Sequence, residues 1–159
     1  MERRRESLAR ARVIANYQFE SDVGSALFPE EVKVTYSKKT GRLRHFHLDG
    51  KIIATFRPKD GFLSLSLTGA TMLASALPPL RFRVIVREDV VKFIADGGDV
   101  FARHVTYADS QLRAGEETIV TSPSGKVVAV GKALLTGKEM IAFKRGVAVK
   151  VRKGVSETI

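Results

Sequence analysis

The stretch D-G-G-D-V-F-A-R-H-V at Asp96–Val105 decides how the second half of this chain is interpreted. It follows Asp89–Ala95, whose apolar residues at positions 90, 93 and 94 have the spacing of a short amphipathic helix with Asp89 as its N-cap. The two glycines can end this helix in the left-handed conformation and leave backbone N–H groups open to a phosphate. Val100–Val105 is then expected to be a strand. The same pattern also fits a turn that binds nothing.

Several short strands are expected after this stretch. They are Glu117–Thr121, Val127–Leu135 and Val147–Arg152, with Ile141–Phe143 as a further candidate. Together with Val100–Val105 they suffice for a small closed or half-closed barrel. In the last strand valines alternate with Lys150 and Arg152, so both cations are expected to face solvent on the same side.

The first half begins with an expected helix at Glu2–Gln18, whose apolar residues fall on one stripe. Arginines crowd its first turns, where positive charge opposes the helix macrodipole. This basic end is either a solvated surface or an arm that an anionic partner would stabilise. The elements expected next are strands at Glu31–Tyr36, Arg42–Leu48, Lys51–Arg57 and Leu63–Leu67, a helix at Gly69–Leu77, and a strand at Arg81–Val86.

Hairpin turns separate these strands and no β-α-β alternation occurs, so the predicted fold class is α+β. A chain of 159 residues is long enough for two small domains. We therefore expect a small antiparallel-sheet domain with helices, followed by a β-barrel. The boundary is expected at Arg87–Asp89, where a strand passes directly into a helix.

The composition favours a polyanionic partner. The chain has 27 Lys and Arg against 17 Asp and Glu, a net charge of +10 and a pI of about 10.2. Nucleic acid is the first candidate and an anionic membrane surface the second. No apolar run reaches the roughly 18 residues of a membrane span, and no signal-peptide pattern is present, so we expect a soluble cytoplasmic protein. Asn and Gln are scarce, which is typical of thermophiles.

No pattern of catalytic residues stands out. The chain has no cysteine, no G-x-S-x-G, no Walker loop and no G-x-G-x-x-G after a strand. His45 and His47 share one face of an expected strand, but no third metal ligand accompanies them. We therefore predict that this chain is not an enzyme by itself and that it has no catalytic residues, no cofactor and no metal site.

The order of these motifs resembles the PUA domain, named for pseudouridine synthase and archaeosine transglycosylase. The resemblance covers Arg87–Gly154 and rests on the helix and glycine loop, then on G-K-A at Gly131–Ala133, E-M at Glu139-Met140 and G-V-A-V-K-V-R at Gly146–Arg152. Upstream, short matches resemble the smaller domain that precedes PUA in archaeosine tRNA-guanine transglycosylases. They are Ala15–Phe19, Ser37–Arg44, Arg57–Gly61 and Gly69-Ala70. A counterpart of that enzyme's large catalytic barrel is lacking.

The resemblance implies an archaeal, RNA-binding protein with a pre-PUA α+β domain at 1–86, a PUA domain at 87–154 and a tail at 155–159. PUA domains bind RNA through the glycine loop, the strand that it enters and the last strand. Carried over to this sequence, the implied RNA-binding residues are Gly97, Gly98, Val100, Phe101, Ala102, Arg103, Lys132, Lys150 and Arg152. The family often has Ala where Gly98 stands.

Three functions remain open. The first is a non-catalytic protein that docks structured RNA, such as the acceptor region of tRNA, in a modification system. The second is the RNA-binding subunit of a split tRNA-guanine transglycosylase, with another chain supplying the active site. The third is a protein–protein adaptor. The hairpins at Lys33–Lys59 hold eight Lys and Arg against Asp49 as the single acid, and they are an alternative RNA surface.

Overall fold

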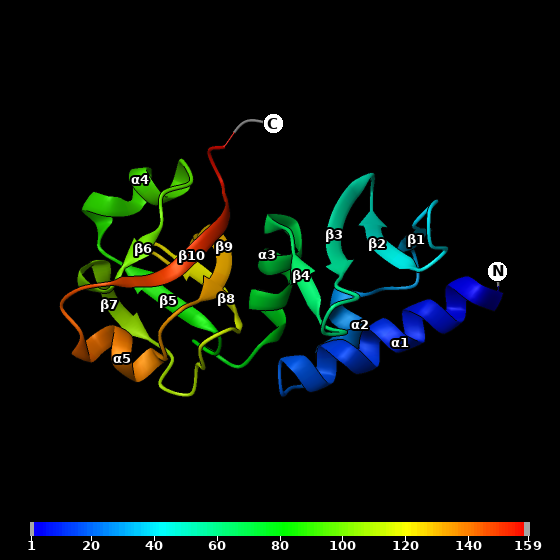
Figure 1. Cartoon of the computed structure of the whole chain (residues 1–159), viewed down its shortest axis with the longest axis horizontal. Helices are drawn as coiled ribbons and strands as arrows, with labels where there is room; N and C mark the ends of the chain where they lie inside the picture. Colours follow the sequence, from blue (N-terminus) through cyan, green and yellow to red (C-terminus); the bar gives the residue numbers. More distant parts are fainter. Residues whose placement is uncertain (1, 158–159) are drawn as a thin grey trace. The chain divides into compact units, whose positions relative to one another are not determined.

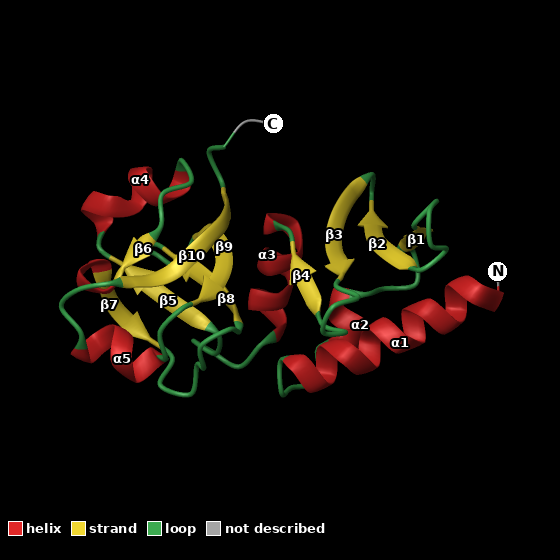
Figure 2. Cartoon of the chain, in the orientation of Figure 1, coloured by secondary structure: helices red, strands yellow, loops and turns green. Residues whose placement is uncertain are grey.

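The computed structural model describes residues 2–157 and divides into two units, Met1–Pro78 and Pro79–Ile159. Each unit combines helices with a predominantly antiparallel sheet (Figures 1 and 2). The predicted α+β class is therefore confirmed.

The first unit is a four-stranded antiparallel meander with helices, in the strand order β1-β2-β3-β4. Its elements are α1 (Glu2–Gln18), α2 (Gly24–Leu27), β1 (Lys33–Tyr36), β2 (Leu43–Leu48), β3 (Lys51–Phe56), β4 (Leu63–Leu65) and α3 (Leu67–Ala76). The first helix and all four strands lie where the sequence places them, because their periodicities are local. The expected fourth strand is shorter, since Leu67 already begins α3.

The helix α1 is held to the rest of its unit by buried side chains and by its polar C-terminal residues. Leu8, Ala11 and Ala15 are buried on its inner stripe. The Asn16 side-chain oxygen accepts hydrogen bonds from the backbone N–H groups that open α2, and the Gln18 amide makes two hydrogen bonds with the backbone of Leu63. These contacts fix α1 against α2 and β4.

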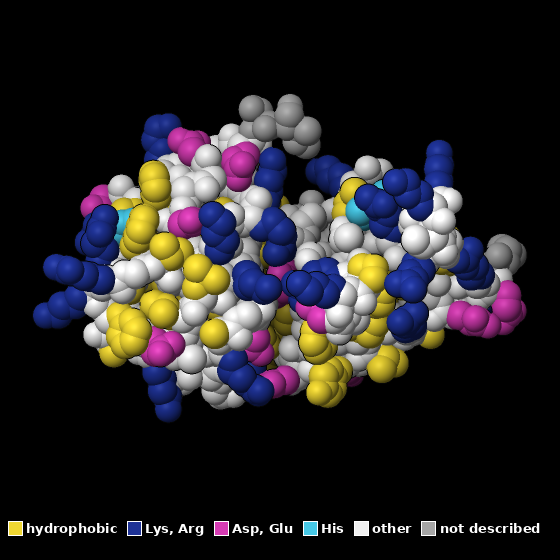
Figure 3. Space-filling model, in the orientation of Figure 1, with side chains coloured by type: hydrophobic (Ala, Val, Ile, Leu, Met, Phe, Trp, Pro, Cys, Tyr) yellow, Lys and Arg dark blue, Asp and Glu magenta, His cyan; other side chains and the backbone are white. Residues whose placement is uncertain are grey.

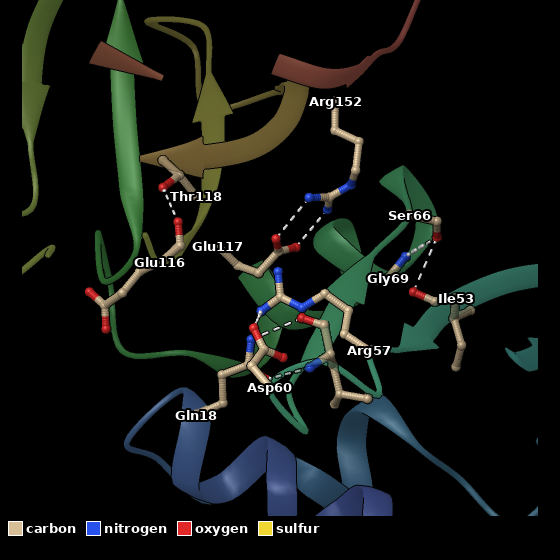
Figure 4. A network of polar contacts seen from close by, with 11 residues as sticks. Gln18, Ile53, Arg57, Asp60, Ser66, Gly69, Glu116, Glu117, Thr118 and Arg152 are labelled. Atoms are coloured by element: carbon tan, nitrogen blue, oxygen red, sulfur yellow. Dashed lines mark hydrogen bonds and ion pairs between the residues drawn. The ribbon is translucent and has the colours of Figure 1, made fainter. Parts of the chain in front are cut away.

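Helix α3 approaches β3 closely at Gly69. A Cβ at this position would lie 2.0 Å from the carbonyl oxygen of Ile53, so only glycine fits. The Ser66 hydroxyl caps the helix by accepting from the Gly69 N–H at 3.0 Å, and it donates to the Ile53 carbonyl at 3.2 Å (Figure 4). The sequence S-L-T-G thus both starts α3 and docks it on the sheet.

The second unit is a six-stranded, barrel-like sheet in the order β6-β10-β9-β8-β5-β7. Its elements are β5 (Arg83–Val86), η1 (Glu88–Val90), α4 (Val91–Ala95), β6 (Val100–Phe101), η2 (Ala102–His104), β7 (Val105–Ala108), β8 (Glu117–Thr121), β9 (Val127–Ala133), α5 (Gly137–Ala142) and β10 (Val147–Gly154). The pair β5–β8 is parallel and the other recorded pairs are antiparallel.

The strand β5 belongs to the second sheet, although the sequence assigned it to the first domain. It pairs with β7 and β8, which follow it in the chain. Alternation of apolar residues indicates which face of a strand is buried but not which strands it will pair with. Pairing with β7 and β8 therefore places β5 in the second sheet.

Three further expectations about the second unit are wrong. Val100–Val105 is interrupted by the 3-10 turn η2, in which the Val105 N–H donates to the carbonyl of Ala102, so the expected strand is divided into β6 and β7. Asp89 does not cap α4, since its carboxylate pairs with Arg87 at 3.0 Å. Ile141–Phe143 is not a strand, since Ile141 and Ala142 end α5 and Phe143 is its C-cap. A capping box between Thr136 and Glu139 starts that helix.

Candidate nucleic-acid interface

The helix α4 ends in a Schellman motif made by the two glycines. Gly97 has a φ of 104°, as predicted for a left-handed residue. Its N–H donates to the carbonyl of Ile94, and the Gly98 N–H donates to that of Phe93, both at 2.9 Å. The expectation that the Gly98 N–H stays open to a phosphate is wrong, because the last carbonyls of the helix need these donors.

Gly98 instead makes room for an aromatic ring. A Cβ at Gly98 would lie 2.4 Å from the ring of Phe93, which is 51% exposed. The His104 ring contacts two phenylalanines in T-shaped arrangements. Its centre lies 6.4 Å from that of Phe93 and 5.3 Å from that of Phe101. We call Phe93, Phe101 and His104 the aromatic cluster.

His104 anchors the aromatic cluster from below the surface. Its side chain is buried, and its Nδ1 accepts a hydrogen bond from the Phe101 N–H at 3.3 Å. Burial lowers the pKa of His104, and the cations Arg103 and Arg87 lower it further against an opposing effect of Asp89. The sequence analysis missed this residue, since a histidine beside an arginine on an expected strand has no distinctive signal.

Two lysines of the predicted site lie directly opposite each other on adjacent strands. Lys150 of β10 pairs in register with Lys132 of β9, and both are exposed. Like charges at this position repel. Asp99 offsets the repulsion in part, since its carboxylate lies 3.3 Å from the Lys150 ammonium.

Asp99 also ties the glycine loop to β10. One carboxylate oxygen accepts from the Val151 N–H at 2.9 Å, while the other faces Lys150. The loop and the last strand are thus held side by side, as the implied RNA site requires. Asp99 lies inside the stretch Asp96–Val105, but the sequence pattern does not predict its contact with β10.

Arg152 differs from Lys150, although both were expected to face solvent as phosphate partners. Its guanidinium forms a two-pronged ion pair with Glu117, with N–O distances of 2.6 and 2.8 Å (Figure 4). The side chain remains 37% exposed, but its charge is already matched. The expected exposure of Arg152 is confirmed, and its role as a phosphate partner stays a prediction. Its partner Glu117 lies two strands away, which alternation along β10 cannot indicate.

The remaining predicted residues divide by burial. Val100 and Ala102 are buried, so their side chains belong to the core of the unit. Phe101 is half-buried in the aromatic cluster, and the exposed Arg103 places its guanidinium 5.1 Å from the Phe101 ring centre. On the second unit, Figure 3 shows hydrophobic side chains interspersed with Lys and Arg.

The histidine pair of the first unit is occupied by hydrogen bonds. His45 Nδ1 lies 3.0 Å from the Thr55 hydroxyl, and His47 Nε2 lies 3.2 Å from that of Thr35. Burial, then Arg44 and His47, lowers the pKa of His45. Within residues 2–157, no three His, Cys, Asp or Glu side chains gather as a metal site, and no helix is both long and apolar enough to cross a membrane.

Both units match known families. Residues 9–79 match the patch-forming domain C2 of tRNA-guanine transglycosylase, and residues 82–155 match the PUA domain. The chain is 42% identical over 143 residues to the tRNA-guanine(15) transglycosylase of Pyrococcus abyssi, covering 90% of this chain and 24% of the relative. It is 40% identical over 154 residues to that of Methanobrevibacter smithii, covering 96% of this chain and 23% of the relative. The chain thus spans about a quarter of the length of these relatives.

Solved structures share the fold. A hypothetical protein from Pyrococcus horikoshii matches with a TM-score of 0.75 and 22% identity, covering 96% of this chain and 92% of the other. A conserved PUA domain protein from Thermoplasma acidophilum matches with a TM-score of 0.69 and 24% identity, covering 97% and 91%. At these identities the likeness speaks for the fold alone.

Proposed function

This chain is a PUA-domain protein that resembles the C-terminal region of archaeosine tRNA-guanine transglycosylases, and we propose that it binds structured RNA, docking the acceptor region of tRNA through its second unit. The proposed surface comprises the glycine loop at Gly97 and Gly98, the aromatic cluster and Arg103. It also includes Lys132 and Lys150, which we call the lysine pair. We further propose that the protein acts without catalysis of its own in the cytoplasm of a thermophilic archaeon, which its basic composition and its scarcity of Asn and Gln support.

The observation that carries this proposal is the lysine pair. Directly opposite residues on an antiparallel pair have Cβ atoms about 5 Å apart, so Lys132 and Lys150 extend side by side from a rigid sheet. Duplex RNA presents a shallow minor groove flanked by phosphates and 2′-hydroxyls, and it is recognised mainly by shape. A sheet surface with two adjacent ammonium groups supports contact with such a backbone.

The proposal is tested by titrating unmodified tRNA into the protein at several salt concentrations. Affinity should fall with salt, by a log–log slope of about 0.7 to 0.9 for each phosphate neutralised. A truncated tRNA without its acceptor stem should bind more weakly than the whole molecule. Binding that is independent of salt, or of the acceptor stem, would contradict the proposed docking.

A second candidate function is the RNA-binding subunit of a split transglycosylase. It is supported by the identities of 42% and 40% to two tRNA-guanine(15) transglycosylases, of whose length this chain spans about a quarter. Purification of the tagged protein from its own cells, followed by mass spectrometry, tests this idea. Recovery of a stoichiometric catalytic chain supports the subunit, and recovery with RNA alone supports the stand-alone protein.

A further inference from the structure

The first unit has a cationic pocket that the proposed function does not use. Its volume is about 450 Å³, and it lies between α1, the turn that joins β1 to β2 and the turn that joins β3 to β4. The pocket is lined by the arginines Arg3, Arg10 and Arg42 and by the aromatic residues Tyr36 and Phe56, and no Asp or Glu among residues 2–157 lines it. We call it the arginine pocket.

Aromatic rings support two of the three guanidinium groups. That of Arg3 lies 3.6 Å from the centre of the Tyr36 ring, and that of Arg10 lies 4.8 Å from the centre of the Phe56 ring. Arg3 also donates to the carbonyl of Gly41, and the Tyr36 hydroxyl is 2.9 Å from that of Ser7. These contacts restrict the side chains before any ligand arrives, which reduces the entropic cost of binding.

No acid of the described residues forms an ion pair with an arginine of the pocket. Within the described part of the chain, the Arg10 and Arg42 side chains have no recorded ion pair or hydrogen bond. Other arginines of the same unit are paired, for example Arg12 with Glu30 at 3.4 Å and Arg57 with Asp60 at 3.2 Å. Arg3 also lies in the first turn of α1, where positive charge opposes the macrodipole. An anion bound in the pocket would neutralise these arginines and would offset the unfavourable interaction of Arg3 with the helix macrodipole.

We propose that the arginine pocket binds the phosphomonoester of a nucleotide, held by Arg10 and Arg42, with the base stacked on the outer face of the Arg3 guanidinium. Guanidinium forks match phosphate oxygens in pairs, and nucleobases stack on arginine planes. A phosphomonoester carries about −1.5 to −2 charges near neutral pH, which suits converging cations better than a singly charged diester. The volume falls within the usual range of ligand sites, about 300 to 1,000 Å³.

The phosphomonoester has two possible sources, a free nucleotide or the phosphorylated end of an RNA. A neighbouring pocket of about 550 Å³ shares Arg42 and Pro58 with the arginine pocket and adds the cations Arg44 and Lys59. This continuation offers space and positive charge for further nucleotides of an attached chain. If the ligand is a phosphorylated RNA end, it should therefore bind more tightly than a free nucleotide, so affinity distinguishes the two sources.

The test is calorimetric titration of the full chain with adenosine 5′-monophosphate, with adenosine as the ligand that lacks phosphate. The monophosphate should bind at least about tenfold more tightly, because hydrogen bonds to charged groups are lost with the phosphate. Arg42→Ala should weaken monophosphate binding about tenfold, while Arg5→Ala, an exposed arginine of α1 outside the pocket, should not change it. Lys150→Ala should also leave it unchanged, which separates this site from the proposed tRNA surface.

The source is decided by a single-stranded RNA hexamer with either a 5′-phosphate or a 5′-hydroxyl. Tighter binding of the phosphorylated hexamer than of the mononucleotide identifies an RNA end, and equal binding identifies a free nucleotide. Equal affinity for adenosine and its monophosphate would overturn the proposal. So would unchanged binding in both Arg42→Ala and Arg10→Ala, provided that thermal melting demonstrates that both variants are folded.

Discussion

Positive charge is displayed differently on the lysine pair of the second unit and in the arginine pocket of the first. Lys132 and Lys150 extend from neighbouring strands, and Asp99 offsets the charge of Lys150 in part. Arg3 and Arg10 instead stack on aromatic rings around a pocket that no Asp or Glu of the described residues lines. Flexible ammonium groups on a sheet suit a repeating phosphate backbone, whereas fixed guanidinium planes suit a single, highly charged group.

Within the second unit, basic residues of the same strand differ in how strongly neighbouring acids engage them. Lys150 is 66% exposed and has one ion pair at 3.3 Å, whereas Arg152 is 37% exposed and makes two contacts with Glu117. Counting basic residues along β10 would treat the two as equal. The geometry ties the Arg152 guanidinium to the sheet through Glu117 and leaves the Lys150 ammonium more exposed, and ligand binding by Lys150 stays a prediction.

The largest loss of stability is expected from Gly97→Val, which strains the backbone of the glycine loop. A β-branched residue is strongly disfavoured at the φ of 104° found here, so the free energy of unfolding should fall by about 2 to 3 kcal/mol. Urea denaturation measures the change. Gly97→Asn should cost less, because Asn tolerates the left-handed region.

Gly98→Val is the matched control for that loop. Gly98 lacks a positive φ, and the added side chain would meet the exposed Phe93 ring, which can move. Its stability loss should therefore be smaller than that of Gly97→Val, while tRNA affinity should fall because Phe93 is displaced. Equal tRNA affinity in Gly98→Val and the unchanged protein would mean that the loop is only a turn.

Arg152→Ala should destabilise the protein without changing its salt response. Removing the guanidinium leaves the Glu117 carboxylate without its two-pronged partner, at a cost of about 1 to 3 kcal/mol. Thermal melting and the salt dependence of tRNA binding measure the two effects separately. A salt slope lowered by a full phosphate contact would instead mean that Arg152 leaves Glu117 when RNA binds.

The double variant Lys132→Ala/Lys150→Ala should reverse that pattern. Because both ammonium groups face solvent, stability should change little, while the log–log salt slope should fall by about 1.4 to 1.8. Lys39→Ala/Lys51→Ala removes the same charge from exposed positions on the first-unit hairpins. If this control lowers the slope and the first variant does not, the RNA surface lies on the hairpins.

The smallest effect concerns pH. The pKa values of His104 and His45 are both lowered from 6.5, so the unfolded chain binds these protons more readily. Their contribution to stability is complete above pH 6.5 and is lost as pH falls from there towards the folded pKa values. His104→Gln and His45→Gln should each flatten the decline of stability between pH 7 and pH 5, measured by urea denaturation. Stability that rises with acidification in this window would contradict the assignment.

Much of the fold was predictable because its signals are local. Helical periodicity predicted α1 with its bounds, and alternation with glycine turns predicted the β1–β4 meander. The left-handed Gly97 and the outward Lys150 follow equally from a helix end and a strand pattern. Resemblance to known families then supplied the expectation of an RNA surface, which composition alone could not place on particular residues.

What the sequence determined by itself was the type of each element, the position of the glycine turn and the excess of positive charge. Only the tertiary structure decided that β5 joins the second sheet, that the Gly98 N–H is occupied and that Glu117 holds Arg152. It also brought arginines of α1 beside Arg42 and two aromatic rings. The physical reason is distance along the chain: periodicity reports which side of an element is buried, whereas a partner for a charge or a strand edge is chosen only when remote segments meet.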